Sequence, residues 1–218
     1  MPEPSQAHAT RDTSAQAWYE DRMVALRKSA QPSMTVAEFL DWDPSDAHGR
    51  RWQLIDGVPV AMAPAADRHG SIQSELGRVL GNHLIATNRR CRVVTAGGII
   101  PHARATRNFR IPDLVVTCAP PGSSVMVPEP ILLVEILSPG NETMSWNNIW
   151  TYTTIPNVQE ILAIHSTRIE AELLRRIPGG DWPKDPEILR VGETLTLSSL
   201  DYAVTLADLY RTTDLVAE

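Results

Sequence analysis

Several features are scarce in this chain, and each scarcity argues against a class of protein. It has only two cysteines, Cys91 and Cys118, far apart in the sequence. This favours reduced, buried thiols over a disulfide framework or a zinc site. No apolar run approaches the roughly 18 residues that a membrane-spanning helix needs. Positive charge is also in deficit, because the net charge is −6. We therefore expect no general electrostatic attraction to nucleic acid, only a local basic site.

The remaining composition is that of an ordinary globular protein. Hydrophobic residues make up 43% and charged residues 21% of 218 positions, which is enough chain to bury a full core. Residues 1–32 are polar and rich in Pro, Ser and Ala, without the apolar stretch of a signal peptide. We predict a flexible tail followed by an appended helix over 15–30. Residues 33–218 are predicted to form one domain.

Local patterns along this domain predict alternating helices and strands. A capping box at Thr35 and Glu38 starts a short helix. Asp56-Gly57 predicts a hairpin, and an apolar stripe at helical spacing occupies 68–87. Further strands are predicted at 91–95, 99–102, 158–165, 168–176, 187–191 and 194–197, with helices at 142–154 and 206–210. This order indicates an α/β fold with a mixed central β-sheet flanked by helices.

Two apolar runs in the middle of the chain each contain one acidic residue. Asp113 lies in the run 111–117 and Glu135 in the run 131–140. Both runs are short and rich in Val, Ile and Leu, as buried strands are. An unpaired buried carboxylate costs several kcal/mol, so it is normally paired, protonated or bound to a metal. Two carboxylates on neighbouring strands predict a Mg²⁺ site. The alternative is that each acid ends a strand and faces water.

Six short motifs, taken in order, resemble one protein family. They are Met34-Thr-Val-Ala-Glu-Phe-Leu, Trp52-Gln-Leu-Ile-Asp-Gly, Arg68-His69, Ile111-Pro-Asp-Leu-Val-Val, Leu133-Val-Glu-Ile-Leu-Ser-Pro, and Tyr152 with Ile155-Pro-Asn-Val-Gln-Glu. By order and spacing the series resembles the Uma-type (Uma two) putative restriction endonucleases, a branch of the PD-(D/E)XK nuclease superfamily. The resemblance covers roughly residues 33–211. It implies a restriction-endonuclease-like core.

The resemblance also implies a metal-dependent hydrolase that cuts phosphodiester bonds in DNA. Asp113 and Glu135 would hold Mg²⁺ or Mn²⁺, with the backbone carbonyl of Ile136 as a third ligand. Such an ion neutralises phosphate charge and lowers the pKa of the attacking water. His69 stands where the family often has His, so it is the first candidate for a proton-transferring group. A residue near a helix start can equally be a cap or a surface residue.

Two departures from the family pattern predict weak or absent catalysis. Gln53 stands where the family usually has Glu, so it brings an oxygen ligand and no charge. Leu137 stands where the superfamily usually has lysine. The resemblance implies that this family's lysine has moved into the following helix, and we expect Asn148 to occupy its place. The only lysines, Lys28 and Lys184, lie outside the motifs. The alternative to a weak enzyme is a catalytically inactive pseudo-nuclease that binds nucleic acid or protein. A small-molecule phosphoesterase is a third option.

A basic turn precedes the first acid. Arg104, Arg107 and Arg110 lie just before Asp113 and are predicted to contact DNA phosphates, although the turn could also be a solvated charge run. Arg107 and Arg110 are also candidates to replace the missing lysine charge. We expect DNA as the substrate, no membrane partner and a cytoplasmic location. The sequence leaves the oligomeric state open, with a homodimer as one option.

Overall fold

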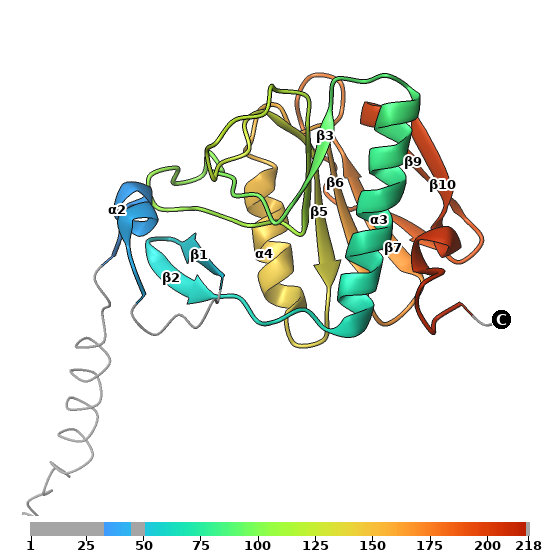
Figure 1. Cartoon of the computed structure of the whole chain (residues 1–218), viewed down its shortest axis with the longest axis horizontal. Helices are drawn as coiled ribbons and strands as arrows, with labels where there is room; N and C mark the ends of the chain where they lie inside the picture. The colour runs from blue at the N-terminus through green and yellow to red at the C-terminus, as the bar shows by residue number, and fades with distance from the viewer. Residues whose placement is uncertain (1–32, 45–50, 217–218) are drawn as a thin grey trace, which may run out of the picture. The chain divides into compact units, whose positions relative to one another are not determined.

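The computed structural model describes residues 33–44 and 51–216 (Figure 1). The tail and helix predicted within 1–32 lie outside these residues. A six-stranded sheet forms the centre, and all of its neighbouring strands are antiparallel except the parallel pair β5–β6. In spatial order its strands are β3 (Arg92–Thr95), β4 (Leu114–Thr117), β5 (Pro130–Leu137), β6 (Glu160–His165), β7 (Glu170–Arg175) and β8 (Glu187–Arg190). The predicted mixed α/β architecture is confirmed.

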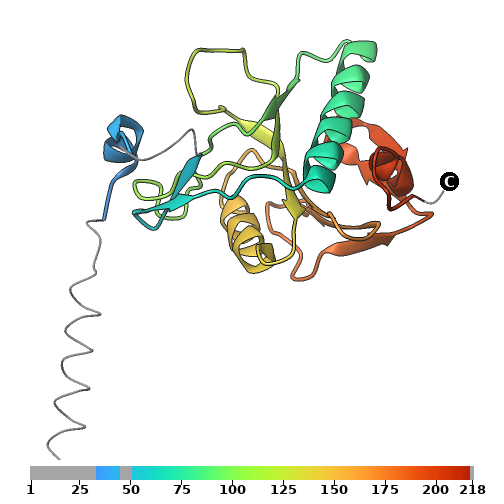
Figure 2. The same ribbon diagram turned by 60° about the horizontal axis from the view of Figure 1, so that its bottom comes forward.

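Two helices cover opposite faces of the sheet, as Figure 2 shows. Helix α3 (Asp67–Ala86) packs on the face reached by Leu132, Val134 and Ile136 of β5. Helix α4 (Glu142–Tyr152) packs on the other face. Side chains alternate across a strand. Glu135 therefore shares its face with Leu133 and Leu137, beneath α4.

The N-terminal part of the domain follows its local signals closely. The capping box of Thr35 and Glu38 starts α2 (Val36–Asp41). Strands β1 (Trp52–Ile55) and β2 (Val58–Ala61) form the predicted hairpin, with positive φ at both turn residues, Asp56 and Gly57. Leu54 and Phe109 exchange backbone hydrogen bonds of 2.8 and 3.0 Å, which ties the hairpin to the chain just before Asp113.

The C-terminal part adds a small second layer beside α3, visible in Figure 1. Strands β9 (Thr194–Leu197) and β10 (Tyr202–Thr205) form a two-stranded sheet around the 3₁₀ turn η1 (Ser198–Leu200). The sequence did not predict β10. The helix predicted at 206–210 is the 3₁₀ helix η2 (Leu206–Tyr210), which contacts α3.

Two sequence expectations are wrong. The strand predicted at 99–102 is reduced to an isolated bridge between Ile99 and Arg110, because Pro101 lacks a backbone N–H to continue a ladder. Cys91 and Cys118 form a disulfide rather than free thiols. They meet because the antiparallel register of β3 and β4, continued by one residue from the pair of Arg92 and Thr117, puts the cysteines opposite each other.

Within the described parts of the chain, no helix is long and apolar enough to cross a membrane.

Candidate functional site

Asp113 lies immediately before β4 rather than inside a strand. Continuing the β4–β5 register from the pair of Leu114 and Val134 by one residue places Asp113 opposite Glu135. Its main-chain carbonyl accepts hydrogen bonds from the Gln73 side chain at 2.7 Å and the Ala96 N–H at 3.1 Å. The structure therefore fixes this carboxylate at the end of β4 and beside β5.

Both oxygens of the Asp113 carboxylate are engaged. Oδ2 accepts a hydrogen bond from the Ile136 N–H at 2.7 Å, and Oδ1 lies 2.9 Å from Nε2 of His69. The other ring nitrogen of His69, Nδ1, lies 3.2 Å from Oγ of Ser138. His69 belongs to the first turn of α3 and is only 13% exposed. Its ring thus orients the acid, which a surface residue would not do.

Glu135 is buried and shares one oxygen between two donors from α4. The Tyr152 hydroxyl donates to Oε1 at 2.5 Å, and the Asn148 amide lies at 3.5 Å from the same atom. Burial and then the negative charge of Asp113 raise the pKa of Glu135 to about 8, against the hydrogen bonds from Tyr152 and Asn148 and the charge of Arg110. Two neighbouring carboxylates repel each other when both are ionised, and a bound cation would relieve that repulsion.

The donor set suits a hard divalent cation. Asp113 and Glu135 offer carboxylate oxygens, and Oδ1 of the buried Asn148 has no hydrogen-bond partner in the described structure. Mg²⁺ and Mn²⁺ prefer oxygen ligands, with one or two carboxylates and several waters. Ile136 is held to Asp113 through its N–H, and its carbonyl as a third ligand stays a prediction.

The two positions discussed for the missing lysine differ in environment. Leu137 packs in the apolar cluster with Ile149 and Tyr152, on the Glu135 face of β5. Asn148, by contrast, directs its amide at Glu135. A lysine moved from the strand into α4 would therefore reach the acid from position 148, where this chain has only a neutral hydrogen-bonding group.

The predicted arginines do not form one surface. Arg104 and Arg107 are exposed, and Arg104 pairs with Asp56 at 2.8 Å. Arg110 is 3% exposed and lies close enough to Glu135 for its charge to lower the pKa of that acid. Gln53 is buried as well, and the register of the Leu54–Phe109 bridge, continued by one residue, places it opposite Arg110.

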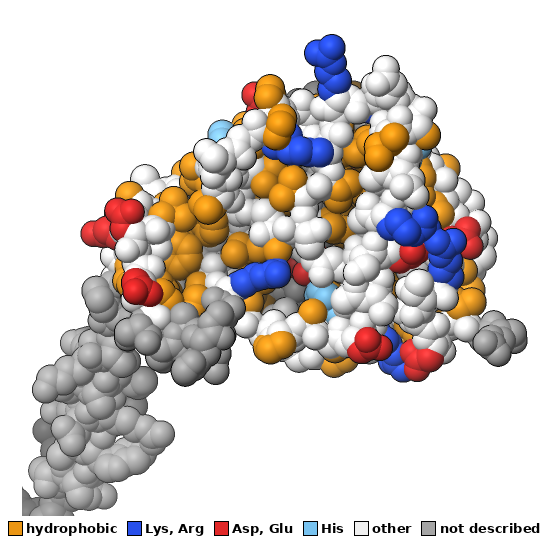
Figure 3. Space-filling model, viewed as in Figure 1, with side chains coloured by type: hydrophobic (Ala, Val, Ile, Leu, Met, Phe, Trp, Pro, Cys, Tyr) orange, Lys and Arg blue, Asp and Glu red, His pale blue; other side chains and the backbone are white. Residues whose placement is uncertain are grey.

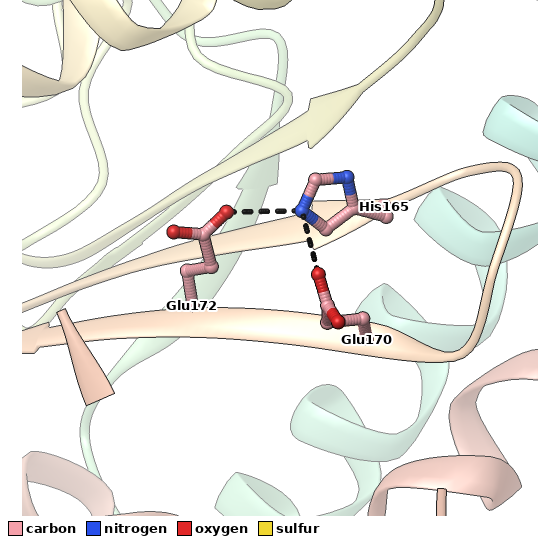
Figure 4. Close-up of side chains that lie close together, drawn as sticks. All are labelled: His165, Glu170 and Glu172. Atoms are coloured by element: carbon pink, nitrogen blue, oxygen red, sulfur yellow. Dashed lines mark hydrogen bonds and ion pairs between the residues drawn. The ribbon is translucent and has the colours of Figure 1, made fainter. Parts of the chain in front are cut away.

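A second group of potential ligands lies on β6 and β7, which the sequence analysis did not identify. Nε2 of His165 lies 3.0 Å from Glu172 and 3.6 Å from Glu170. Figure 4 shows both carboxylates directed at this ring nitrogen. The positive charge of Arg168 already neutralises part of this cluster, because its guanidinium lies 2.8 Å from Glu170 and 3.0 Å from His165. We therefore interpret this cluster as an ion-pair network.

Tyr152 is the residue at the first site whose contact the sequence reasoning missed. It is fully buried, and its hydroxyl donates a hydrogen bond to Glu135. A signal was present, since Asn148 and Tyr152 are four residues apart and so share one face of a helix. The His165 cluster depends on the pairing of β6 with β7, which no local pattern specifies.

The chain is similar to several known proteins. A family model described as Uma2, putative restriction endonuclease, matches residues 36–207. The uncharacterized protein slr1290 of Synechocystis sp. is 29% identical over 164 residues, which cover 73% of this chain and 84% of that protein. A crystal structure described as a putative nuclease belonging to DUF820, from Anabaena variabilis, matches with a TM-score of 0.65 at 17% identity and covers 81% of this chain and 97% of that one. At that identity the structural match shows the fold.

Proposed function

The chain belongs to the Uma2 family of putative restriction endonucleases, and on this premise we propose that it is a metal-dependent endonuclease that hydrolyses phosphodiester bonds in DNA. The observation that carries the proposal is the pairing of two carboxylates at the β4–β5 junction. Asp113 is held by His69 and Ile136, and Glu135 is buried opposite it with a raised pKa. A bound cation would relieve their mutual repulsion.

Each residue of the site has a role in the proposal. Asp113 and Glu135 hold Mg²⁺ or Mn²⁺, with the Ile136 carbonyl as a third ligand. The ion, when bound, supplies neutralisation of phosphate charge and a more acidic water. His69 orients Asp113 through Nε2 and is our candidate for proton transfer. Gln53 contributes an uncharged oxygen in a buried position.

We propose that the catalytic rate is low. A positioned proton-transferring group typically contributes ~10²–10⁴-fold to a rate. Leu137 cannot provide such a group, and Asn148 offers Glu135 a hydrogen bond without charge. The uncharged side chains at positions 137 and 148 also favour the second candidate function, a catalytically inactive pseudo-nuclease that binds nucleic acid or protein.

The proposal extends to partners and location. DNA would approach through local contacts such as the exposed Arg104 and Arg107, because basic side chains are scattered rather than gathered on the face in Figure 3. We place the protein in the cytoplasm, where DNA is present. A homodimer and a division into an N-terminal extension (1–32) and a nuclease domain (33–218) belong to the same proposal.

Plasmid cutting tests this function. Supercoiled plasmid would be incubated with Mg²⁺ or Mn²⁺ and wild-type protein, with Asp113→Asn as the matched control that keeps side-chain shape. We expect slow nicking by the wild type that Asp113→Asn abolishes. Cutting that survives Asp113→Asn would place the chemistry elsewhere. No cutting together with retained DNA binding would favour the pseudo-nuclease.

A further inference from the structure

Arg110 is a buried cation that has no ion-pair partner among the residues the structure describes. Its side chain is 3% exposed, and Nε has no hydrogen-bond partner in the described structure. Its side-chain hydrogen bond is long, 3.4 Å from Nη1 to the Leu54 carbonyl. No Asp or Glu of the described residues lies within ion-pair distance of it. A buried guanidinium without a counterion is costly, so such groups normally pair with a carboxylate or a phosphate.

The backbone holds Arg110 firmly in place. Arg110 and Ile99 exchange main-chain hydrogen bonds of 2.8 and 2.9 Å, and the preceding residue, Phe109, does the same with Leu54. The register of these bridges puts Gln53 opposite Arg110. The backbone of Arg110 is therefore held by secondary structure, three residues before Asp113. The guanidinium lies close enough to Glu135 and Tyr152 for its charge to act on both.

Buried polar atoms of Arg110, Gln53 and Asn148 have no hydrogen-bond partner in the described structure, and together they suit a ligand of mixed character. Nε of Arg110 is an unused donor, whereas Oε1 of Gln53 and Oδ1 of Asn148 are unused acceptors. All three side chains are more than nine-tenths buried. A cation alone would leave the guanidinium unpaired, and an anion alone would leave the two amide oxygens unpaired. A phosphate oxygen together with a hydrated divalent cation satisfies both kinds of atom.

We propose that Arg110 binds a non-bridging oxygen of the reacting phosphodiester, so that the acid pair and this guanidinium form a joint cation-and-phosphate site. This inference rests on the proposed function and deepens it, because it assigns the substrate phosphate to a buried residue rather than to the exposed turn. Arg110 is thus a catalytic residue that carries positive charge where the family's lysine is absent. Its planar donor fork suits a phosphate oxygen better than an ammonium point charge does.

The inference is tested by measuring the binding of a short DNA duplex. Ca²⁺ is used in place of Mg²⁺ so that binding is measured apart from cutting. Arg110→Met should weaken DNA binding by about 10–100-fold, the typical effect of losing a hydrogen bond to a charged group. Arg190→Met, which changes an exposed arginine on β8 at the edge of the sheet away from β4, is the control and should change the affinity by less than about threefold. Manganese binding without DNA should be unchanged or tighter in Arg110→Met, because a cation has been removed near Glu135.

A duplex with a methylphosphonate at the contacted position separates a contact from a structural effect. The neutral phosphate should weaken wild-type binding and have no further effect on Arg110→Met. The DNA affinity of Arg110→Lys, which keeps the charge, should lie between those of the wild type and Arg110→Met. This variant replaces Arg110→Met in the test if Arg110→Met does not fold.

Three results would overturn the inference. The first is equal DNA affinity of folded Arg110→Met and wild type, and the second is that the losses of affinity caused by Arg110→Met and by the methylphosphonate add up. The third is a wild type that binds Mn²⁺ but does not bind DNA. If the wild type does not bind Mn²⁺, that result would instead refute the proposed function. The duplex is also titrated without metal, so that the contribution of Arg110 is measured in that case too.

Discussion

At Glu135 a carboxyl group sits in a place that favours its neutral form. It is buried, faces the negative charge of Asp113, and has a pKa of about 8. The folded chain therefore binds a proton there across a pH range in which the unfolded chain has already released it. Stability must fall as pH rises through that range, because the unfolded state then binds fewer protons than the folded state.

A glutamine at this position tests the sign of that effect. In metal-free buffer with a chelator, the melting temperature of the wild type should fall between about pH 5 and pH 8 relative to Glu135→Gln, whose amide cannot ionise. The two proteins should differ least below about pH 4, where Glu135 is largely protonated in both states. Parallel melting curves across the range would show that Glu135 does not titrate with a raised pKa.

Lysine grafts test the account of low activity. Asn148→Lys would place an ammonium beside Glu135, lower the pKa of that acid and raise the rate of Asp113-dependent cutting, by up to ~10²–10⁴-fold if proton transfer limits the reaction. Leu137→Lys would bury an ammonium among Ile149 and Tyr152 and should cost several kcal/mol of stability. Fast cutting by the wild type would mean that His69 or an arginine already fills the role.

At the scale of elements, strand β5 organises the site through its alternation. Leu132, Val134 and Ile136 bind the sheet to α3, while Glu135 faces α4. Acidic residues within apolar strands were recognisable from the sequence, as were the α2 capping box and the hairpin turn, because each is a local pattern. Strand β10 and the acid's partner Tyr152 depend on contacts between distant segments, which a local pattern does not encode.

The link between β3 and β4 is a further element-scale feature that the sequence reasoning got wrong. The disulfide of Cys91 and Cys118 closes a loop with a sequence separation of 27. Loop entropy predicts that it stabilises the fold by about 3–4 kcal/mol at most. Reduction with dithiothreitol should therefore lower the melting temperature of the wild type and leave Cys118→Ser unchanged. A count of two free thiols in the unreduced, unfolded protein would contradict the pairing.

At the scale of the whole molecule, an acidic chain must bind an acidic polymer through few contacts. Net charge is −6, and the exposed arginines of the turn are Arg104 and Arg107. Each neutralised phosphate adds about −0.9 to the log–log salt slope on duplex DNA. Replacing both arginines by Ala should flatten the slope by up to about two units. An unchanged slope would move the DNA contact to another surface.

The central claim is that the divalent cation binds between Asp113 and Glu135 and not at the second cluster. Calorimetric titration of Mn²⁺ into wild type, Asp113→Asn and Glu172→Gln tests it most directly, since each variant neutralises one carboxylate of one cluster. We expect one ion bound by the wild type and by Glu172→Gln, and none by Asp113→Asn. Equal heats from the wild type and Asp113→Asn, or loss of binding in Glu172→Gln, would contradict the account.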